Sequence, residues 1–159
     1  MSVLVVGSVA YDSVKTQAGQ REKALGGSAT YFSISGSYFT PVSVIGVVGD
    51  DFLPAHMELM ESHRVDTSGI ERRPGKTFHW SGVYGAEHLN TRETLDTQLN
   101  VFADFSPVLR PRDKTSPYLF LANIDPELQL DVLNQMDGRP RLVALDTMNF
   151  WIEGKRAAL

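Results

Sequence analysis

The amino-acid sequence predicts an α/β fold in which a parallel or mostly parallel sheet is flanked by helices. Short apolar runs that end at glycine or aspartate indicate strands buried on both faces. Stretches with apolar residues at helical spacing follow these runs, as expected for a doubly wound sheet. One further stretch has a period of two and predicts a pair of strands that protrudes from the sheet.

The first strand and helix come from the amino-terminal 39 residues. Val3–Val6 is an apolar run that ends at Gly7, and it predicts a buried strand. We expect a polar loop over residues 15–23. A helix is predicted for residues 29–39, where aromatic residues recur at helical spacing, and Ser28 is its expected N-cap.

The second strand and helix follow directly. Residues 42–48 form another apolar run and predict a second buried strand. Residues 52–63 carry apolar side chains on one helical face, so a helix is expected there. His56 and His63 lie seven residues apart on this helix with no third ligand nearby. We interpret them as partly buried helix residues and not as metal ligands.

Alternating residues then replace the helical pattern. Large side chains alternate with small or polar ones in residues 78–84 and again in residues 95–103. A period of two indicates strands with one solvated face, which is typical of an antiparallel pair. Residues 87–92 are the expected polar connection. This hairpin interrupts the strand–helix rhythm and should project from the main sheet.

The strand–helix rhythm resumes near residue 118. Residues 118–122 predict a strand, and Asp125 followed by Pro126 predicts the start of a helix. The inner stripe of that helix is expected to be Leu128, Val132, Leu133 and Met136. Residues 142–145 predict a further strand, and residues 151–159 the start of another helix. A doubly wound domain rarely ends within such a unit, so we expect a fragment, with a complete small domain as the alternative.

Composition excludes several classes of protein. The chain has 159 residues, a net charge of −4, ordinary hydrophobic content and no cysteine, so it has neither a disulfide framework nor a thiolate metal site. It shows no basic face for nucleic acid, no apolar stretch that would span a membrane and no signal peptide at its start. A cytoplasmic location is expected.

Three segments together resemble a known family. Residues 5–12 read VVGSVAYD, residues 25–30 read LGGSAT and residues 44–51 read VIGVVGDD. Their order and spacing resemble the N-terminal half of the PfkB (ribokinase-like) sugar and nucleoside kinases, and the resemblance runs through residues 1–159. The hairpin over residues 77–105 resembles the lid of that family.

Asp12 is the first candidate for substrate binding. It lies just past the first strand, and ligands bind at the carboxyl ends of strands in open α/β sheets. A carboxylate there can accept hydrogen bonds from neighbouring sugar hydroxyls, although a turn-capping role is the alternative. The resemblance implies that Asp12 binds substrate hydroxyls.

Gly26, Gly27 and Tyr31 form the second candidate group. The glycines allow close approach of a ligand at a helix N-terminus, or they form a plain turn; the resemblance favours substrate contact. Many family members have asparagine at the position of Tyr31. An aromatic ring there can stack on a sugar or a base, or it can turn into the core, and it argues against simple ribose specificity.

The third candidate is Asp50, within Gly49-Asp50-Asp51. This segment follows the second strand and precedes a helix, and in the family it lies near the substrate side. For Asp50, substrate binding and helix capping stay open. For Asp51 we expect capping, because an acidic residue near a helix start favours the helix dipole.

The resemblance implies ATP-dependent phosphorylation of a hydroxymethyl group on a sugar or nucleoside, with ATP and Mg²⁺ as cofactors of the parent enzyme. We expect the family's Gly-Ala-Gly-Asp and Asn-x-x-Glu motifs, and with them the ATP site and the catalytic base, to lie outside this chain. No catalytic or metal-binding residue is therefore predicted within it, and the chain alone is expected to be inactive. A homodimer through the lid is a further expectation. The alternative function is a non-catalytic sugar- or nucleotide-binding module.

Two other nucleotide-binding motifs are excluded. Residues 69–77 resemble a P-loop, but five residues separate the two glycines where the motif has four, and strand-like alternation follows. The GxGxxG fingerprint of NAD-binding domains is absent after Gly7, which disfavours an NAD-dependent enzyme.

Overall fold

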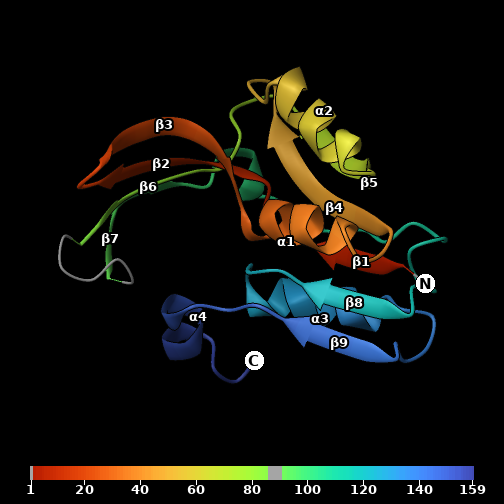
Figure 1. Cartoon of the computed structure of the whole chain (residues 1–159). Coiled ribbons are helices and arrows are strands. Elements are labelled where there is room, and N and C mark those ends of the chain that lie inside the picture. The colour runs from red at the N-terminus through yellow and green to blue at the C-terminus, as the bar shows by residue number, and fades with distance from the viewer. Residues whose placement is uncertain (1, 86–90) are drawn as a thin grey trace.

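A computed structural model describes residues 2–85 and 91–159, and it contains two sheets (Figure 1). The main sheet has the strand order β5-β4-β1-β8-β9, and all neighbouring strands in it are parallel. Its strands are β1 (Val3–Val6), β4 (Val42–Gly49), β5 (Val65–Arg73), β8 (Tyr118–Leu121) and β9 (Leu142–Leu145). The predicted α/β fold with a parallel sheet is confirmed.

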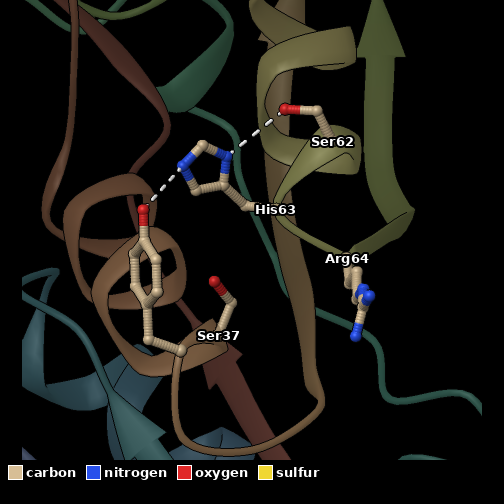
Figure 2. A pocket seen from close by; sticks show the side chains of 5 residues that line it. Ser37, Ser62, His63 and Arg64 are labelled. Carbon is tan, nitrogen blue, oxygen red and sulfur yellow. Dashed lines mark hydrogen bonds between the residues drawn. The ribbon is translucent and has the colours of Figure 1, made fainter.

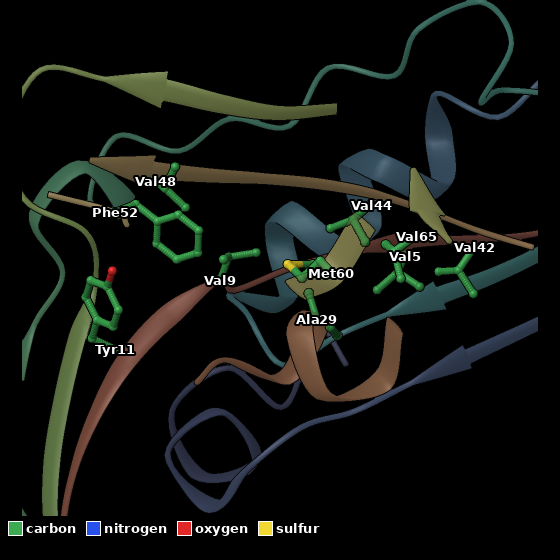
Figure 3. Close-up of a cluster of buried hydrophobic side chains, with 11 residues drawn as sticks. Val5, Val9, Tyr11, Ala29, Val42, Val44, Val48, Phe52, Met60 and Val65 are labelled. Atoms are coloured by element: carbon green, nitrogen blue, oxygen red, sulfur yellow. The ribbon is translucent and has the colours of Figure 1, made fainter. Parts of the chain in front are cut away.

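Helices cover both faces of the main sheet. On one face, α1 (Ser28–Ser37) and α2 (Pro54–Ser62) pack on the core that contains Val5 and Val44 (Figure 3). On the other face, α3 (Pro126–Asn134) packs on the core that contains Leu4. Successive side chains of a strand point to opposite faces, so a central strand must be apolar throughout to fill both cores. This requirement explains the uninterrupted apolar runs of β1 and β4.

A second sheet, which we call the lid sheet, extends away from the main sheet (Figure 1). Its order is β3-β2-β6-β7, with strands β2 (Ala10–Thr16), β3 (Gly19–Gly26), β6 (His79–Tyr84) and β7 (Arg92–Gln98). The β2–β3 and β6–β7 pairs are antiparallel, and β2 runs parallel to β6. The first predicted lid strand is observed as β6. Of the predicted connection, residues 87–90 lie outside the described residues.

Two expectations for the lid were wrong. The expected polar loop over residues 15–23 instead belongs to the hairpin of β2 and β3, which turns between Thr16 and Gly19. Residues 17–23 of this hairpin are exposed, so this part of it carries no apolar period. The expected second lid strand over residues 95–103 stops at Gln98, where the 3₁₀ helix η1 (Asn100–Phe102) begins. Asn100 has φ = 51° and donates from Nδ2 to the carbonyl of Thr77 at 3.0 Å, which ends the strand.

The start of α1 also differs from the expectation. Gly27, and not Ser28, is the N-cap, and no side chain caps the helix from that position. Ser8 satisfies the first N–H groups instead: its Oγ accepts from Ser28 N at 3.2 Å, and its carbonyl accepts from Ala29 N at 3.1 Å. The end of strand β1 thus holds the start of the helix.

The carboxy-terminal elements match the sequence more closely. Asp125 caps α3 as predicted, since its Oδ1 accepts from Glu127 N at 3.0 Å. The last helix, α4 (Asn149–Gly154), starts before the expected range of 151–159 and ends before residue 159. Lys155 bonds both Asp125 (2.6 Å) and Glu127 (2.5 Å), so the segment after α4 is tied to the start of α3. No helix among the described residues is long and apolar enough to cross a membrane.

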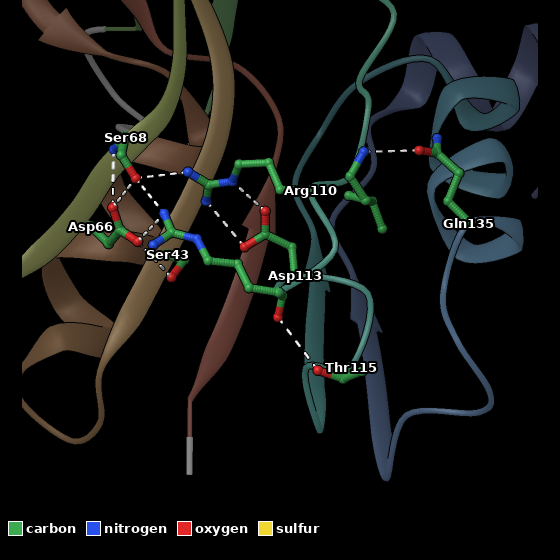
Figure 4. A network of polar contacts seen from close by, with 9 residues as sticks. Ser43, Asp66, Ser68, Arg110, Asp113, Thr115 and Gln135 are labelled. Atoms are coloured by element: carbon green, nitrogen blue, oxygen red, sulfur yellow. Dashed lines mark hydrogen bonds and ion pairs between the residues drawn. The ribbon is translucent and has the colours of Figure 1, made fainter.

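A polar network fixes the edge strand β5 (Figure 4). Arg110 bonds the buried carboxylate of Asp113 through two nitrogens, at 2.5 and 3.0 Å, and it reaches Ser68 Oγ at 2.7 Å. Arg112 bonds Asp66 Oδ2 at 2.9 Å. Because charged side chains cover it, this edge of the sheet is protected from pairing with another chain.

Candidate functional site

Asp12 lies on β2 at the base of the lid sheet, directly after the carboxyl end of β1. Its register partners are Ala24 on β3 and Trp80 on β6. The side chain is half-buried, and its carboxylate makes no hydrogen bond or ion pair with any described residue. Burial raises the pKa of this carboxyl, and His79 acts in the opposite direction. Asp12 is therefore an acceptor that is removed from water without receiving a partner.

The two glycines before α1 serve different contacts. A Cβ at Gly26 would lie 2.3 Å from Asp12 Oδ2, so the carboxylate occupies the space that a side chain would fill. Gly27 has φ = 93°, and a Cβ there would lie 2.3 Å from the carbonyl oxygen of Ser8. The absence of a side chain at Gly27 is therefore explained by packing against the backbone that follows β1, whereas at Gly26 it makes room for Asp12.

Tyr31 does not turn into the core, which was one of the two expectations for it. The side chain is 62% exposed, and its hydroxyl donates to the carbonyl of Leu25 at 3.3 Å. Partial burial raises the pKa of its hydroxyl, and the nearby Asp12 and Tyr84 raise it further. The ring of Tyr31 thus belongs to the same site as Asp12.

The sequence did not single out Trp80 and Tyr84 as site residues. Both lie on the same face of β6, two positions on either side of Gly82, and Trp80 is paired with Asp12. The period of two that predicted β6 is the signal that places them on one face. The sequence could not show that this face lies beside Asp12, because the strand that carries Asp12 was not recognised.

Asp50 and Asp51 bind the segment that leads into β6 of the lid sheet. Asp50 is exposed, and its Oδ2 accepts from Gly75 N at 3.2 Å. Asp51 Oδ1 accepts from both the N–H and the hydroxyl of Thr77, each at 2.7 Å. The expected capping role of Asp51 was wrong, because α2 starts at Pro54 with Leu53 as its N-cap. No described contact joins Asp50 to the group around Asp12.

Two more polar atoms lie at the carboxyl edge of the main sheet. Asn123 Oδ1 and Thr147 Oγ1, which follow β8 and β9, are buried and have no hydrogen-bond partner. Gln129 fixes the two loops by donating to the carbonyls of Leu121 (3.1 Å) and Asp146 (3.1 Å). Strand order reverses between β1 and β8, and ligands of open α/β sheets bind at such a switch point. These atoms extend the candidate site beyond Asp12.

A cavity of about 410 Å³ lies elsewhere, at the carboxyl ends of α1 and α2 (Figure 2). The hydroxyl of Tyr38 and Nε2 of His63 are 3.3 Å apart at its wall. Helices of a parallel α/β unit run opposite to the strands, so this cavity lies at the other edge of the sheet. As predicted, His63 and also His56 are partly buried. A second hollow of about 530 Å³ lies between β5 and residues 105–110. Neither contains Asp12.

Among the described residues, no three histidine, aspartate and glutamate side chains gather as they would around a metal ion that the protein alone holds. Gly-Ala-Gly-Asp is absent from the sequence, in line with the expectation. Asn-x-x-Glu was expected to be absent too, but the tetrapeptide occurs once, as Asn90-Thr91-Arg92-Glu93. Glu93 lies on β7, the exposed edge strand of the lid sheet, and not at the carboxyl edge of the main sheet.

No protein-family model matches the chain. Among curated proteins, a cytidine kinase from Thermococcus kodakarensis is 26% identical over 141 residues, which are 87% of this chain and 49% of the relative. The chain thus spans about half the length of the curated relative that it matches.

Solved structures match over a similar share. A ribokinase from Cryptococcus neoformans has a TM-score of 0.75 at 17% identity, with 99% of this chain and 54% of the ribokinase covered. A nucleoside kinase from Methanocaldococcus jannaschii has a TM-score of 0.67 at 16% identity, over 91% of this chain and 52% of the kinase. A fructokinase from Halothermothrix orenii has a TM-score of 0.67 at 14% identity, over 92% of this chain and 57% of the fructokinase. The predicted resemblance to the PfkB kinases is therefore confirmed for the fold: the chain has the ribokinase-like fold over about half the length of the kinases that share it.

Proposed function

We propose that the chain forms the acceptor-binding part of an ATP-dependent sugar or nucleoside kinase. The observation that carries this proposal is the carboxylate of Asp12, which is half-buried and has no hydrogen-bond partner among residues 2–85 and 91–159. It lies where the lid sheet meets the carboxyl edge of the main sheet. Relatives that are named ribokinase, nucleoside kinase, fructokinase and cytidine kinase support this class of acceptor.

A polar acceptor supplies what Asp12 lacks. Withdrawing a carboxylate from water is unfavourable unless hydrogen bonds replace the lost solvation. Two neighbouring hydroxyls of a sugar ring or a ribose can each donate to one of its oxygens. Binding would therefore remove a cost that the free site carries.

The remaining predicted residues have unequal roles in this proposal. Gly26 lets the carboxylate lie close to the backbone, and Tyr31 forms one wall of the site. Gly27 acts through the turn that brings α1 to β1. For Asp50 we propose an indirect role, because its carboxylate holds the segment at Gly75 that leads into β6.

Phosphoryl transfer needs groups that we place outside these 159 residues. ATP with Mg²⁺ would supply the phosphoryl group in the parent enzyme, and the described acidic residues do not gather to hold the metal. The lid sheet would exclude water from the acceptor, which suppresses hydrolysis. The exposed edge strand β7 is the surface through which we propose a homodimer. A cytoplasmic location stays a prediction.

Calorimetric titration of the chain tests the proposal with ribose, fructose, cytidine and adenosine. At least one of them should bind, and Asp12→Asn should raise its dissociation constant about tenfold to hundredfold, because a hydrogen bond to a charged group contributes about 1.5–3 kcal/mol. Asp131→Asn, on the exposed side of α3, is the matched control and should leave binding unchanged. Equal binding by the Asp12 variant and the wild type would refute the proposal.

A further inference from the structure

The face of the lid sheet beside Asp12 is aromatic. Trp80 on β6 is the register partner of Asp12 on β2, and partners on neighbouring strands project from the same face. The indole ring extends along β6 over Gly82, where a Cβ would lie 2.3 Å from the ring atom Cη2. Gly82 therefore leaves the space that the ring fills.

The orientation of Trp80 is fixed by a hydrogen bond across the sheet. Its Nε1–H donates to Thr94 Oγ1 on β7 at 3.2 Å, and Thr94 is the register partner of Gly82. Nε1 is hydrogen-bonded to Thr94, and the six-membered part of the indole ring fills the space above Gly82. Together these two contacts hold the ring in one position. A fixed ring loses little conformational entropy when a ligand stacks on it.

Tyr31 provides a second ring near Asp12. It comes from α1, and its hydroxyl is held by the carbonyl of Leu25. Asp12 and Tyr84 both raise the pKa of the Tyr31 hydroxyl, so Tyr31 lies near the face of the lid sheet that carries Trp80 and Tyr84. Asp12 is thus a charged acceptor that has aromatic side chains as neighbours.

We infer that the acceptor is a ribonucleoside, whose base stacks on Trp80 while its ribose hydroxyls donate to Asp12. This inference rests on the proposed function, since it chooses between the sugars and nucleosides of that proposal. A free sugar can pack only a C–H face on an aromatic ring, whereas a planar base stacks on it with its whole π-face. A nucleoside combines a vicinal diol with a flat base, which matches one carboxylate beside aromatic rings. Trp80 is then the residue that determines specificity.

Trp80 also supplies the readout for the test. The chain has two tryptophans, and Trp151→Phe leaves Trp80 as the only one. In this background we would titrate cytidine, adenosine, D-ribose and D-fructose and follow Trp80 fluorescence together with binding heats. Both nucleosides should quench the fluorescence and bind more tightly than either sugar.

Substitution of the ring separates stacking from hydroxyl binding. Base–aromatic stacking contributes about 1–3 kcal/mol, so Trp80→Leu should weaken cytidine binding by roughly fivefold to a hundredfold. Asp12→Asn should weaken cytidine binding as well, and 2′-deoxycytidine should be less sensitive to that substitution because it has lost one hydroxyl donor. Circular dichroism of each variant verifies that the lid sheet has remained folded.

The outcomes distinguish the two proposals. Suppose that fructose or ribose binds more tightly than the nucleosides, that its binding depends on Asp12 and that Trp80→Leu leaves its affinity unchanged. This result would overturn the nucleoside inference and leave the kinase proposal standing. Nucleoside binding that is equal in Trp80→Leu and in its parent would show that the base does not stack on Trp80, and would also overturn it. Asp12→Asn without effect on any of the four ligands would remove both proposals.

Discussion

The carboxylate of Asp12 occupies the space that a side chain at Gly26 would take, with Oδ2 2.3 Å from the position of the missing Cβ. The two residues are diagonal neighbours across the β2–β3 pair, where Asp12 is paired with Ala24 and Gly26 with Ala10, next to the start of α1. Asp12 therefore keeps its position only while residue 26 is glycine. Gly27, one residue later, packs on the backbone of Ser8 and not on a side chain.

This difference predicts unequal effects of alanine at the two glycines. Gly26→Ala meets only the flexible end of Asp12, so it should move the carboxylate, weaken ligand binding tenfold or more and leave stability within about 1 kcal/mol. Gly27→Ala meets backbone atoms and a positive φ, so it should lower the free energy of unfolding by about 1–3 kcal/mol or more. Urea unfolding and calorimetric titration of both variants measure the contrast. Equal destabilisation by the two alanines would contradict it.

The raised pKa of Asp12 predicts a dependence of stability on pH. An acid whose pKa is higher in the folded than in the unfolded chain stabilises the fold below the unfolded value, and this contribution is lost as pH rises through the folded value. Asp12→Asn should therefore be more stable than the wild type at pH 7. The difference should shrink as pH falls towards the ordinary aspartate pKa of 3.8. Thermal unfolding from pH 4 to 7 measures it, with Asp131→Asn as the control that should show no such trend.

Ligand affinity should change with pH in the opposite sense. The carboxylate accepts hydrogen bonds from ligand hydroxyls, whereas the protonated acid loses much of that capacity. Affinity should therefore fall as pH drops through the raised pKa of Asp12, and the fall should be absent in Asp12→Asn. A wild-type affinity that stays constant between pH 4 and 7 would contradict this assignment.

Thr77 predicts a further effect, on the attachment of the lid sheet. Its buried hydroxyl donates to Asp51 Oδ1 at 2.7 Å and accepts from Gly49 N at 3.0 Å. Thr77→Val keeps the shape but leaves the Gly49 N–H without a partner, so it should cost about 1–3 kcal/mol. Thr97→Val, on the exposed strand β7, should change stability by less than about 0.5 kcal/mol. Urea unfolding measures both, and an equally small effect at Thr77 would contradict the role of this hydroxyl.

The sequence predicted every strand of the main sheet except β5, and it missed the β2–β3 hairpin of the lid sheet. Central strands such as β1 and β4 fill two cores, so they read as continuous apolar runs. Edge strand β5 has mainly polar residues and a register irregularity opposite Ser43 to Ile45, and β3 is mostly exposed. A strand that buries little apolar surface leaves no period in the sequence.

The candidate site shows the same limit. Asp12, Gly26 and Tyr31 were found through a resemblance in local segments, each close in the sequence to a strand end or a helix start. The pairing of Asp12 with Trp80 joins strands that are far apart in the chain and parallel. No local pattern encodes such a pairing, because it depends on how the two hairpins of the lid sheet meet at β2 and β6. The aromatic wall of the site therefore required the structure.

The outer strand β9 predicts self-association of the chain. Leu142 and Leu145 are 58% and 50% exposed on this strand, which is the last of the main sheet. An exposed apolar edge invites pairing with another chain, and a lysine there opposes it. Sedimentation velocity at increasing concentration should show oligomers that are reduced in the double variant Leu142→Lys, Leu145→Lys. Val108→Lys, in an exposed loop, is the control and should not reduce them. A wild-type chain that stays monomeric would contradict this expectation.

The 159-residue chain alone should not catalyse phosphoryl transfer. Such transfer depends on positioned groups that stabilise charge around the transferring phosphate. The sequence has no Gly-Ala-Gly-Asp motif, and the described residues bring no three acidic or histidine side chains together. Asp12 cannot serve as the base if its carboxylate already accepts the other hydroxyls of the acceptor. Asp146 follows β9, yet its backbone is engaged with Leu121 and Gln129, and Thr147 and Met148 follow it in place of a glycine-rich anion site.

We therefore expect no release of ADP above background when the purified chain is mixed with ATP, Mg²⁺ and each of cytidine, adenosine, ribose and fructose. Binding of the acceptor should persist in the same sample, because the proposed contacts from Asp12 and Trp80 belong to this chain. Asp12→Asn is the matched control, since any contaminating kinase would be indifferent to that substitution. Turnover at about 1–100 per second, a rate typical of kinases, would contradict the prediction if Asp12→Asn abolished it. Such a result would mean that this half of the fold assembles a complete transfer site, and the search for the base would then turn to Asp146 and the buried polar atoms of Asn123 and Thr147 beside it.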